Sequence, residues 1–186
     1  MQKLNIVVVA STTREKRLSI KAAELVADVG KEFPEVEIIL VDVKDFFPLP
    51  GEGNDPESQH PKWIAINQKS DAYFIVTPEY NHSFPGSLKM LLDNDLKNYI
   101  HKPVAMAGVS SSGTGGARAI ESLLPPLREL GLVATFTDVL FFQIGTFLEQ
   151  AASDPEVLEQ QKERIRKAYK ELIWMAKSLK WGRENL

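Results

Sequence analysis

Short apolar runs alternate along the chain with longer stretches in which apolar residues recur every three or four positions. The first run, LNIVVVA at 4–10, consists mainly of branched aliphatic residues. Such composition is typical of a strand that is buried on both faces of a sheet. The same pattern predicts five strands, at 4–10, 36–43, 71–76, 103–110 and 132–142, the last continuous or broken.

The amphipathic stretches that follow the runs have the period of helices. Asp154 is suited to cap the last helix, with Pro155 at its first position. The predicted helices lie at 19–33, 62–70, 87–97, 114–131 and 154–180, with an interruption at Pro125 and Pro126. Residues 143–153 either cover a pocket or simply lead into the last helix.

Alternation of strands and helices predicts a parallel sheet with helices on both faces. A chain of 186 residues without repeats suits a single domain over residues 1–186. In such sheets, ligands bind beyond the carboxyl ends of the strands. The candidate binding loops are therefore those at 10–19, 43–61, 77–86 and 110–116.

Composition excludes several functional classes. The net charge of -3, from 22 basic and 25 acidic side chains, gives no electrostatic case for nucleic acid or an anionic membrane. The absence of cysteine excludes disulfides, thiolate metal sites and cysteine nucleophiles. No segment approaches the roughly 20 apolar residues of a membrane span, so a cytoplasmic location is expected.

The loop after the first strand, ASTTREKRLS, contains no glycine, which excludes both a Rossmann fingerprint and a Walker A loop. Its hydroxyls and arginines precede a helix whose expected N-cap is Ser19. Together with backbone N–H groups they suit a phosphate monoester. A polar turn with solvated arginines fits the same residues equally well.

The loop after the third strand reads TPEYNHSFPG at 77–86. Pro78 has no N–H and so ends strand pairing, and Tyr80 and Asn81 offer an aromatic edge and an amide. With the backbone N–H groups of 79–81, they suit a flat heterocycle with amide-like edges. Glu79 is interpreted as a structural or interface carboxylate rather than a catalytic one, and His82 as incidental.

The loop after the fourth strand, GVSSSGTGGAR, is rich in serine and glycine. Glycines let a backbone lie flat against a ligand, and the helix that follows brings partial positive charge to negative charge on a bound ring. A flexible turn is the alternative interpretation.

These three loops together resemble the NADPH-dependent FMN reductase family. TPEYNHSFPGSLKMLLD is similar to its signature P-E-Y-N-x-S-x-P-G-x-L-K-N-x-x-D, and STTREKRLS and SSSGTGGARAIESLLPPLRELG resemble its other two loop segments. The resemblance implies a flavodoxin-like α/β fold, a doubly wound five-stranded parallel sheet of order 2-1-3-4-5 in three αβα layers. It also implies an NAD(P)H oxidoreductase that passes hydride from NADPH or NADH through FMN to a quinone, an azo compound or free flavin.

The resemblance also implies which residues bind FMN, and it implies no catalytic side chain and no metal. Those implied for the phosphate are Ser11, Thr12, Arg14, Arg17, Ser19 and Ile20. Those implied for the isoalloxazine ring are Pro78, Glu79, Tyr80 and Asn81. Those implied for its pyrimidine side are Ser110, Ser112 and Gly113. The candidates to read a 2′-phosphate of NADPH are Arg14, Lys16, Arg17 and a partner-chain residue.

Three positions depart from the family pattern. Ser11 replaces a glycine, Met90 an asparagine and Asn94 a tryptophan. The resemblance implies a homodimer or homotetramer, which apolar residues of the 77–99 region, Phe84, Met90, Leu91 and Tyr99, support only weakly because core burial explains them too. Two other functions remain open, a flavodoxin-like electron carrier and a cofactor-free regulatory protein.

Overall fold

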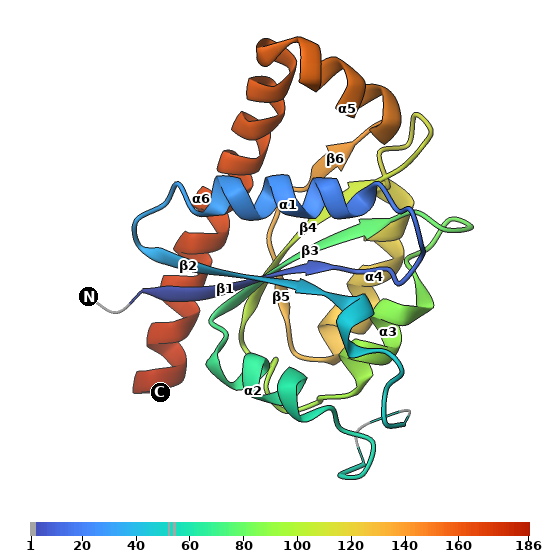
Figure 1. Ribbon diagram of the computed structural model, residues 1–186. Coiled ribbons are helices and arrows are strands. Elements are labelled where there is room, and N and C mark those ends of the chain that lie inside the picture. Colours follow the sequence, from blue (N-terminus) through green and yellow to red (C-terminus); the bar gives the residue numbers. More distant parts are fainter. Residues whose placement is uncertain (1–2, 52, 54) are drawn as a thin grey trace.

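A parallel sheet forms the centre of the molecule in the computed structural model, which describes residues 3–51, 53 and 55–186 (Figure 1). The strands are β1 (Leu4–Ala10), β2 (Val36–Asp42), β3 (Ala72–Pro78), β4 (Pro103–Val109), β5 (Val133–Ala134) and β6 (Val139–Phe141). Their order, β2-β1-β3-β4-β5 with β6 also paired to β4, confirms the predicted order. The predicted fifth strand is broken, and its two short pieces pair with opposite ends of β4.

Helices cover both faces of the sheet, as predicted (Figure 1). They are α1 (Ser19–Gly30), the 3₁₀ helix η1 (Val43–Phe46), α2 (Pro61–Lys69), α3 (Gly86–Asp93), α4 (Ala117–Glu129), α5 (Ile144–Ser153) and α6 (Pro155–Asn185). Successive strand residues point to opposite faces. Ile6 and Val8 therefore pack with α1 and α6, whereas Val7 and Val9 pack with α2, α3 and α4. None of the helices in the described residues combines the length and apolar character that a membrane crossing needs.

Helix α4 runs without a break through Pro125 and Pro126, so the predicted interruption is wrong. A proline removes one helix hydrogen bond, which is tolerated where the released carbonyl reaches water. Pro125 lies on the exposed side, while Leu123 and Leu127 anchor the helix in the core. The predicted cap at Asp154 is confirmed, since its carboxylate accepts a hydrogen bond from the N–H of Glu156 at 2.9 Å.

The four apolar residues of the 77–99 region that gave weak support for a subunit contact are not exposed. Leu91 and Tyr99 are fully buried, and Tyr99 accepts a hydrogen bond from the indole N–H of Trp63 at 3.0 Å. Phe84 and Met90 are half-buried. Core packing therefore explains these side chains, and the oligomeric state stays a prediction.

Asn94 holds the long loop that follows η1. Its side chain is fully buried, and its Oδ1 accepts a hydrogen bond from the N–H of His60 at 2.5 Å. Its Nδ2 donates to the carbonyl oxygens of Ser58 at 2.7 Å and Gly53 at 3.2 Å. The family position that is usually tryptophan is therefore used here to attach Gly53, Ser58 and His60 to the end of α3.

We expect Asn94→Leu to lower the free energy of unfolding by about 2 kcal/mol or more, because it leaves buried backbone groups without partners. Urea unfolding monitored by circular dichroism measures this change. Asn185→Leu, at an exposed position near the end of α6, is the matched control and should change stability little. Equal stability of the two variants would show that the loop does not depend on Asn94.

Candidate functional site

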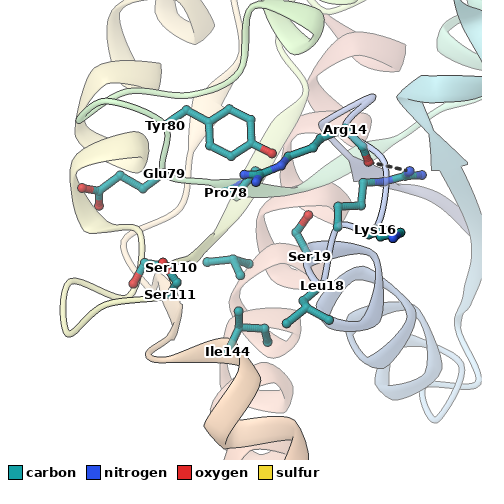
Figure 2. Close-up of a pocket in the computed structure, with 12 residues that line it drawn as sticks. Arg14, Lys16, Leu18, Ser19, Pro78, Glu79, Tyr80, Ser110, Ser111 and Ile144 are labelled. Carbon is teal, nitrogen blue, oxygen red and sulfur yellow. Dashed lines mark hydrogen bonds between the residues drawn. The ribbon is translucent and has the colours of Figure 1, made fainter.

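A cavity of about 270 Å³ lies where the loops after β1, β3 and β4 meet (Figure 2). Its position at the carboxyl ends of the central strands is the one that the topology predicts. The lining residues come from these loops and from the start of α5: Arg14, Lys16, Arg17, Leu18, Ser19, Pro78, Glu79, Tyr80, Val109, Ser110, Ser111 and Ile144.

The structure brings a majority of the predicted site residues to this cavity. Those that line it are Arg14, Arg17, Ser19, Pro78, Glu79, Tyr80 and Ser110. Those that lie outside its lining are Ser11, Thr12, Ile20, Asn81, Ser112 and Gly113. Ile20 is partly buried, and its side chain packs against the core cluster on the α1 side of the sheet.

Ser19 is the first residue of α1 and not its N-cap, so that prediction is wrong. The N-cap is Leu18, which makes no side-chain hydrogen bond to the helix. The first N–H groups of a helix have no partner within it and carry partial positive charge. Because no side chain caps this helix, an anion in the adjoining cavity would supply the missing acceptors.

The two arginines of the first loop have different roles. Arg17 forms an ion pair with Asp42 at the end of β2 and donates to the carbonyl oxygen of Arg14 at 3.2 Å, so it braces the loop. Arg14 is exposed, and its guanidinium carbon lies 5.9 Å from the ring centre of Tyr80. Figure 2 shows Arg14 beside the Tyr80 ring, which leaves Arg14 as the arginine available to a ligand.

A second ion pair ties the same loop to η1. Lys44 Nζ lies 2.6 Å from Glu15 Oε1, and this hydrogen bond lowers the pKa of the Glu15 carboxyl. The loop is therefore attached to the end of β2 and to η1 through residues that are distant in sequence.

Ser11 and Thr12 form the base of the first loop. Thr12 Oγ1 lies 3.2 Å from the hydroxyl of Tyr80 and accepts a hydrogen bond from the N–H of Arg14 at 3.3 Å. Ser11 is fully buried, and its carbonyl oxygen accepts from Ser87 Oγ at 3.1 Å. Ser11 is not among the described residues with positive φ, so the loop makes its turn without the family glycine.

The third-strand loop folds as a tight hairpin turn. Tyr80 and Ser83 exchange backbone hydrogen bonds of 2.8 and 3.0 Å, and the two residues between them, Asn81 and His82, have φ of 50° and 64°. Positive φ at both central residues is characteristic of a type I′ turn. Asn81 therefore occupies an exposed tip, away from the cavity.

The expectation that the N–H groups of 79–81 are free for a ligand is wrong for two of them. The N–H of Glu79 donates to Val109 O at 2.9 Å, and that of Tyr80 donates to Ser83 O.

Glu79 is largely buried, with 8% of its side chain exposed. Its Oε1 lies 3.5 Å from Nη1 of Arg118, which also donates to Nε2 of His82 at 2.8 Å. Its carboxylate is directed away from Arg14 and Ser19 (Figure 2). These contacts give Oε1 a structural role, in line with the sequence interpretation, and leave Oε2 without a partner.

Polar groups of the loop after β4 form hydrogen bonds within the loop. Ser110 Oγ donates to the carbonyl oxygen of Ser112 at 2.7 Å and accepts from the N–H of Gly115 at 2.9 Å. A Cβ on Gly116 would lie 2.6 Å from the backbone of Gly108, and a Cβ on Gly108 would lie 2.7 Å from the backbone of Gly116. Both residues must therefore be glycine where the loop packs on β4. Ser112 and Gly113 form an exposed tip of this loop.

Five residues that line the cavity were not predicted from the sequence to contact the ring or the phosphate: Lys16, Leu18, Val109, Ser111 and Ile144. Ile144 starts α5, and its N–H donates to Ser110 O at 2.9 Å. Residues 143–153 thus both reach the cavity and lead into α6. The signal available in the sequence was the position of Ile144, two residues after the predicted last strand at 132–142.

The polar atoms around the loops fit a phosphate-bearing heterocycle. Among the described residues, buried side-chain atoms without a hydrogen-bond partner include Ser11 Oγ, Arg17 Nε and Glu79 Oε2. Buried polar groups are normally paired, so three such atoms in two adjoining loops indicate an incomplete site. Two donors lie in the phosphate loop, and one acceptor suits a ring N–H. No group of three or more acidic or histidine side chains in the described residues is arranged to hold a metal ion.

A doubly wound sheet of order β2-β1-β3-β4-β5, with a cavity beyond the carboxyl ends of its central strands, defines the flavodoxin-like class of α/β proteins. The chain belongs to the NADPH-dependent FMN reductase family, whose sequence profile matches residues 4–146.

Two curated relatives and one solved structure illustrate the likeness. The chain is 29% identical over 123 residues to a quinone reductase of Pseudomonas putida, covering 62% of this chain and 64% of the relative. It is 29% identical over 122 residues to an NADPH azoreductase of Bacillus sp. strain OY1-2, covering 64% and 66%. The chain therefore spans less than two thirds of the length of these relatives.

The solved structure is an oxidoreductase from Corynebacterium diphtheriae. It superposes with a TM-score of 0.72 over 96% of this chain and 99% of its own, at 19% identity. A likeness at that level of identity describes the fold, and it agrees with the predicted flavodoxin-like architecture.

Proposed function

We propose that the protein is an FMN-dependent NAD(P)H oxidoreductase that reduces a small-molecule acceptor such as a quinone, an azo compound or free flavin. The observation that carries this proposal is the meeting of three family loops at one cavity, beside unpartnered polar atoms of Ser11, Arg17 and Glu79. The quinone reductase and azoreductase among its relatives support the acceptor class.

In this proposal the phosphate is held by the first loop. Arg14 and Lys16 supply positive charge, and the uncapped first turn of α1, from Ser19 and Ile20, supplies N–H donors. Arg17 acts by fixing the loop against Asp42. Ser11 and Thr12 shape the base of the loop, where Ser11 Oγ is a spare donor.

The ring would lie against Pro78, Glu79, Tyr80 and Ser110, which line the cavity. Tyr80 is oriented by the contact of its hydroxyl with Thr12, and Glu79 offers an acceptor to a ring N–H. Asn81, Ser112 and Gly113 stay predictions without a contact to the cavity. Bound FMN supplies the hydride chemistry between nicotinamide and acceptor. The side chains of this site bind and orient, and none is required as an acid or base.

We further propose that residues 1–186 form one domain, that the protein is cytoplasmic, and that it works as a homodimer or homotetramer. The continuous sheet and the two core clusters on its faces support the first of these. The family resemblance supports the last. NADPH and NADH are both retained as co-substrates.

Purified protein incubated with FMN and freed of excess flavin should be yellow, with the visible spectrum of a bound flavin. It should then turn over NADPH or NADH continuously when a quinone, an azo compound or free flavin is added as acceptor. The spectrum and the steady-state rate are measured on the same preparation. A colourless protein after FMN addition would refute FMN binding, whereas tight FMN binding without NAD(P)H consumption would instead support an electron carrier.

A further inference from the structure

A second cavity, of about 380 Å³, lies at the opposite end of the sheet. It is lined by residues at the starts of β1, β3 and β4 and at the ends of α2 and α6: Asn5, Gln68, Lys69, Ser70, Asp71, Lys102, Lys180, Arg183 and Glu184. A strand of seven residues separates the two ends by roughly 23 Å. This cavity is therefore independent of the nucleotide pocket.

Lys102 is a buried cation in this cavity, with 7% of the residue exposed. Its ammonium donates to Asn67 O at 2.6 Å and to Ser70 Oγ at 3.1 Å. These neutral acceptors use two of its three N–H groups. Across residues 3–51, 53 and 55–186, no carboxylate forms an ion pair with Lys102. Buried charges are normally paired, but Asp71 and Asp95 act on Lys102 only from beyond ion-pair distance.

Two further cations approach the same space from α6. Lys180 Nζ lies 2.8 Å from Asp71 Oδ1, and Arg183 Nη2 lies 3.6 Å from the same oxygen. The other oxygen of Asp71 accepts the N–H of Asn5 at 3.0 Å. The buried Asp71 carboxylate is thus shared between two cations and a backbone donor. Both of its oxygens already have partners other than Lys102.

The charges around the cavity do not balance. Its lining contains four cations, from three lysines and one arginine, but only the carboxylates of Asp71 and Glu184. Arg183 has five N–H donors, and its one hydrogen bond goes to His101 O at 2.6 Å. Lys102, Lys180 and Arg183 therefore all line one small polar cavity that holds more cations than carboxylates.

We propose that this cavity binds a small divalent oxyanion, held by Lys102, Lys180 and Arg183. A tetrahedral anion accepts several charge-assisted hydrogen bonds at once and neutralises the excess charge. The same chemistry is offered by a free sulfate or phosphate ion and by the phosphate group of a larger metabolite. The proposal does not depend on the flavin chemistry of the other pocket.

The protonation of Lys102 gives a signature of binding. Burial, and then the positive charge of Arg183, lower the pKa of Lys102 to about 8. The other charged groups that act on it are Asp71, Asp95 and Lys180. A bound dianion favours the charged amine, so binding near pH 8 should take up protons. Sulfate has no protonation step in this range, so the uptake reports on the protein.

The test is calorimetric titration of FMN-saturated protein with sulfate at constant ionic strength, in buffers of different ionisation enthalpy near pH 8. Lys102→Met and Arg183→Gln should each weaken sulfate binding by about tenfold or more. Lys102→Met should also abolish the proton uptake. Lys177→Met removes an exposed cation of α6 that pairs with Glu35 outside the cavity, and it should bind sulfate as the unmodified protein does.

Two further experiments distinguish a free anion from a phosphate group on a larger molecule, and binding in this cavity from binding in the nucleotide pocket. Ribose 5-phosphate replaces sulfate to test whether a phosphate group on a larger molecule enters the cavity. If FMN does not bind, the same titration is made in the Arg14→Ala variant, which weakens the first loop as an anion site. Absence of sulfate binding, or equal binding by the Lys102→Met and Lys177→Met variants, would overturn the proposal.

Discussion

Replacing Arg14 with alanine is expected to weaken FMN binding by ten- to a hundredfold, at about 1.5–3 kcal/mol for a hydrogen bond to a charged group. Arg14 is the arginine of the first loop whose guanidinium is exposed at the cavity, whereas Arg17 is already paired with Asp42. The loss should shrink as salt is raised, because the interaction is electrostatic.

Quenching of flavin fluorescence on titration with protein measures this affinity. Lys21→Ala is the matched control, because Lys21 is an exposed cation of α1 that pairs with Glu24 at 2.8 Å and does not line the cavity. Arg14→Ala should leave the thermal midpoint unchanged, since no buried partner is lost. If both variants bind FMN equally well, the phosphate is held elsewhere.

The Gly116→Ala variant should be less stable by about 3 kcal/mol or more, from left-handed backbone strain together with overpacking. Gly116 has φ of +84°, and an added Cβ would lie 2.3 Å from the backbone nitrogen of Val109. The three nearest atoms, one in Val109 and two in Gly108, belong to the backbone of the central strand β4, which has little freedom to move.

Urea unfolding measures the loss, and the same loop provides the control. A Cβ on Gly113 meets no heavy atom within 4 Å, so Gly113→Ala should change stability by no more than about 0.5 kcal/mol. Ser110 and Ser111 line the cavity and lie in the same loop as Gly116. A shift of this loop in Gly116→Ala should therefore also weaken FMN binding. Equal stability of the two variants would mean that the loop packs differently on β4.

The architecture was predictable because each buried strand is a continuous apolar run and each helix has a clear apolar stripe. Two details were not. The short strands β5 and β6 are separated at residues 135–138, and nothing in LVATFTDVLFF fixes where pairing with β4 stops. The prolines of α4 looked like a break because sequence alone does not show that Pro125 faces water.

The meeting of the three loops was also predictable, since parallel strands bring their following loops to one edge. The distribution of side chains within them was not. Arg17 is 25 residues from its partner Asp42, and Asn81 is turned outward by a hairpin that exists only once Tyr80 pairs with Ser83. Such partners are set by tertiary packing, and a list of suitable residue types gives no sign of them.

The division of the last strand into β5 and β6 has a consequence for solubility. An unbroken edge strand offers its free N–H and C=O groups to the edge of another molecule. Here the edge of the sheet beside β4 consists of two short strands, the two residues of β5 and the three of β6. The exposed Phe136 lies between them. This edge of the sheet is too short on either side of the gap to act as a template for aggregation.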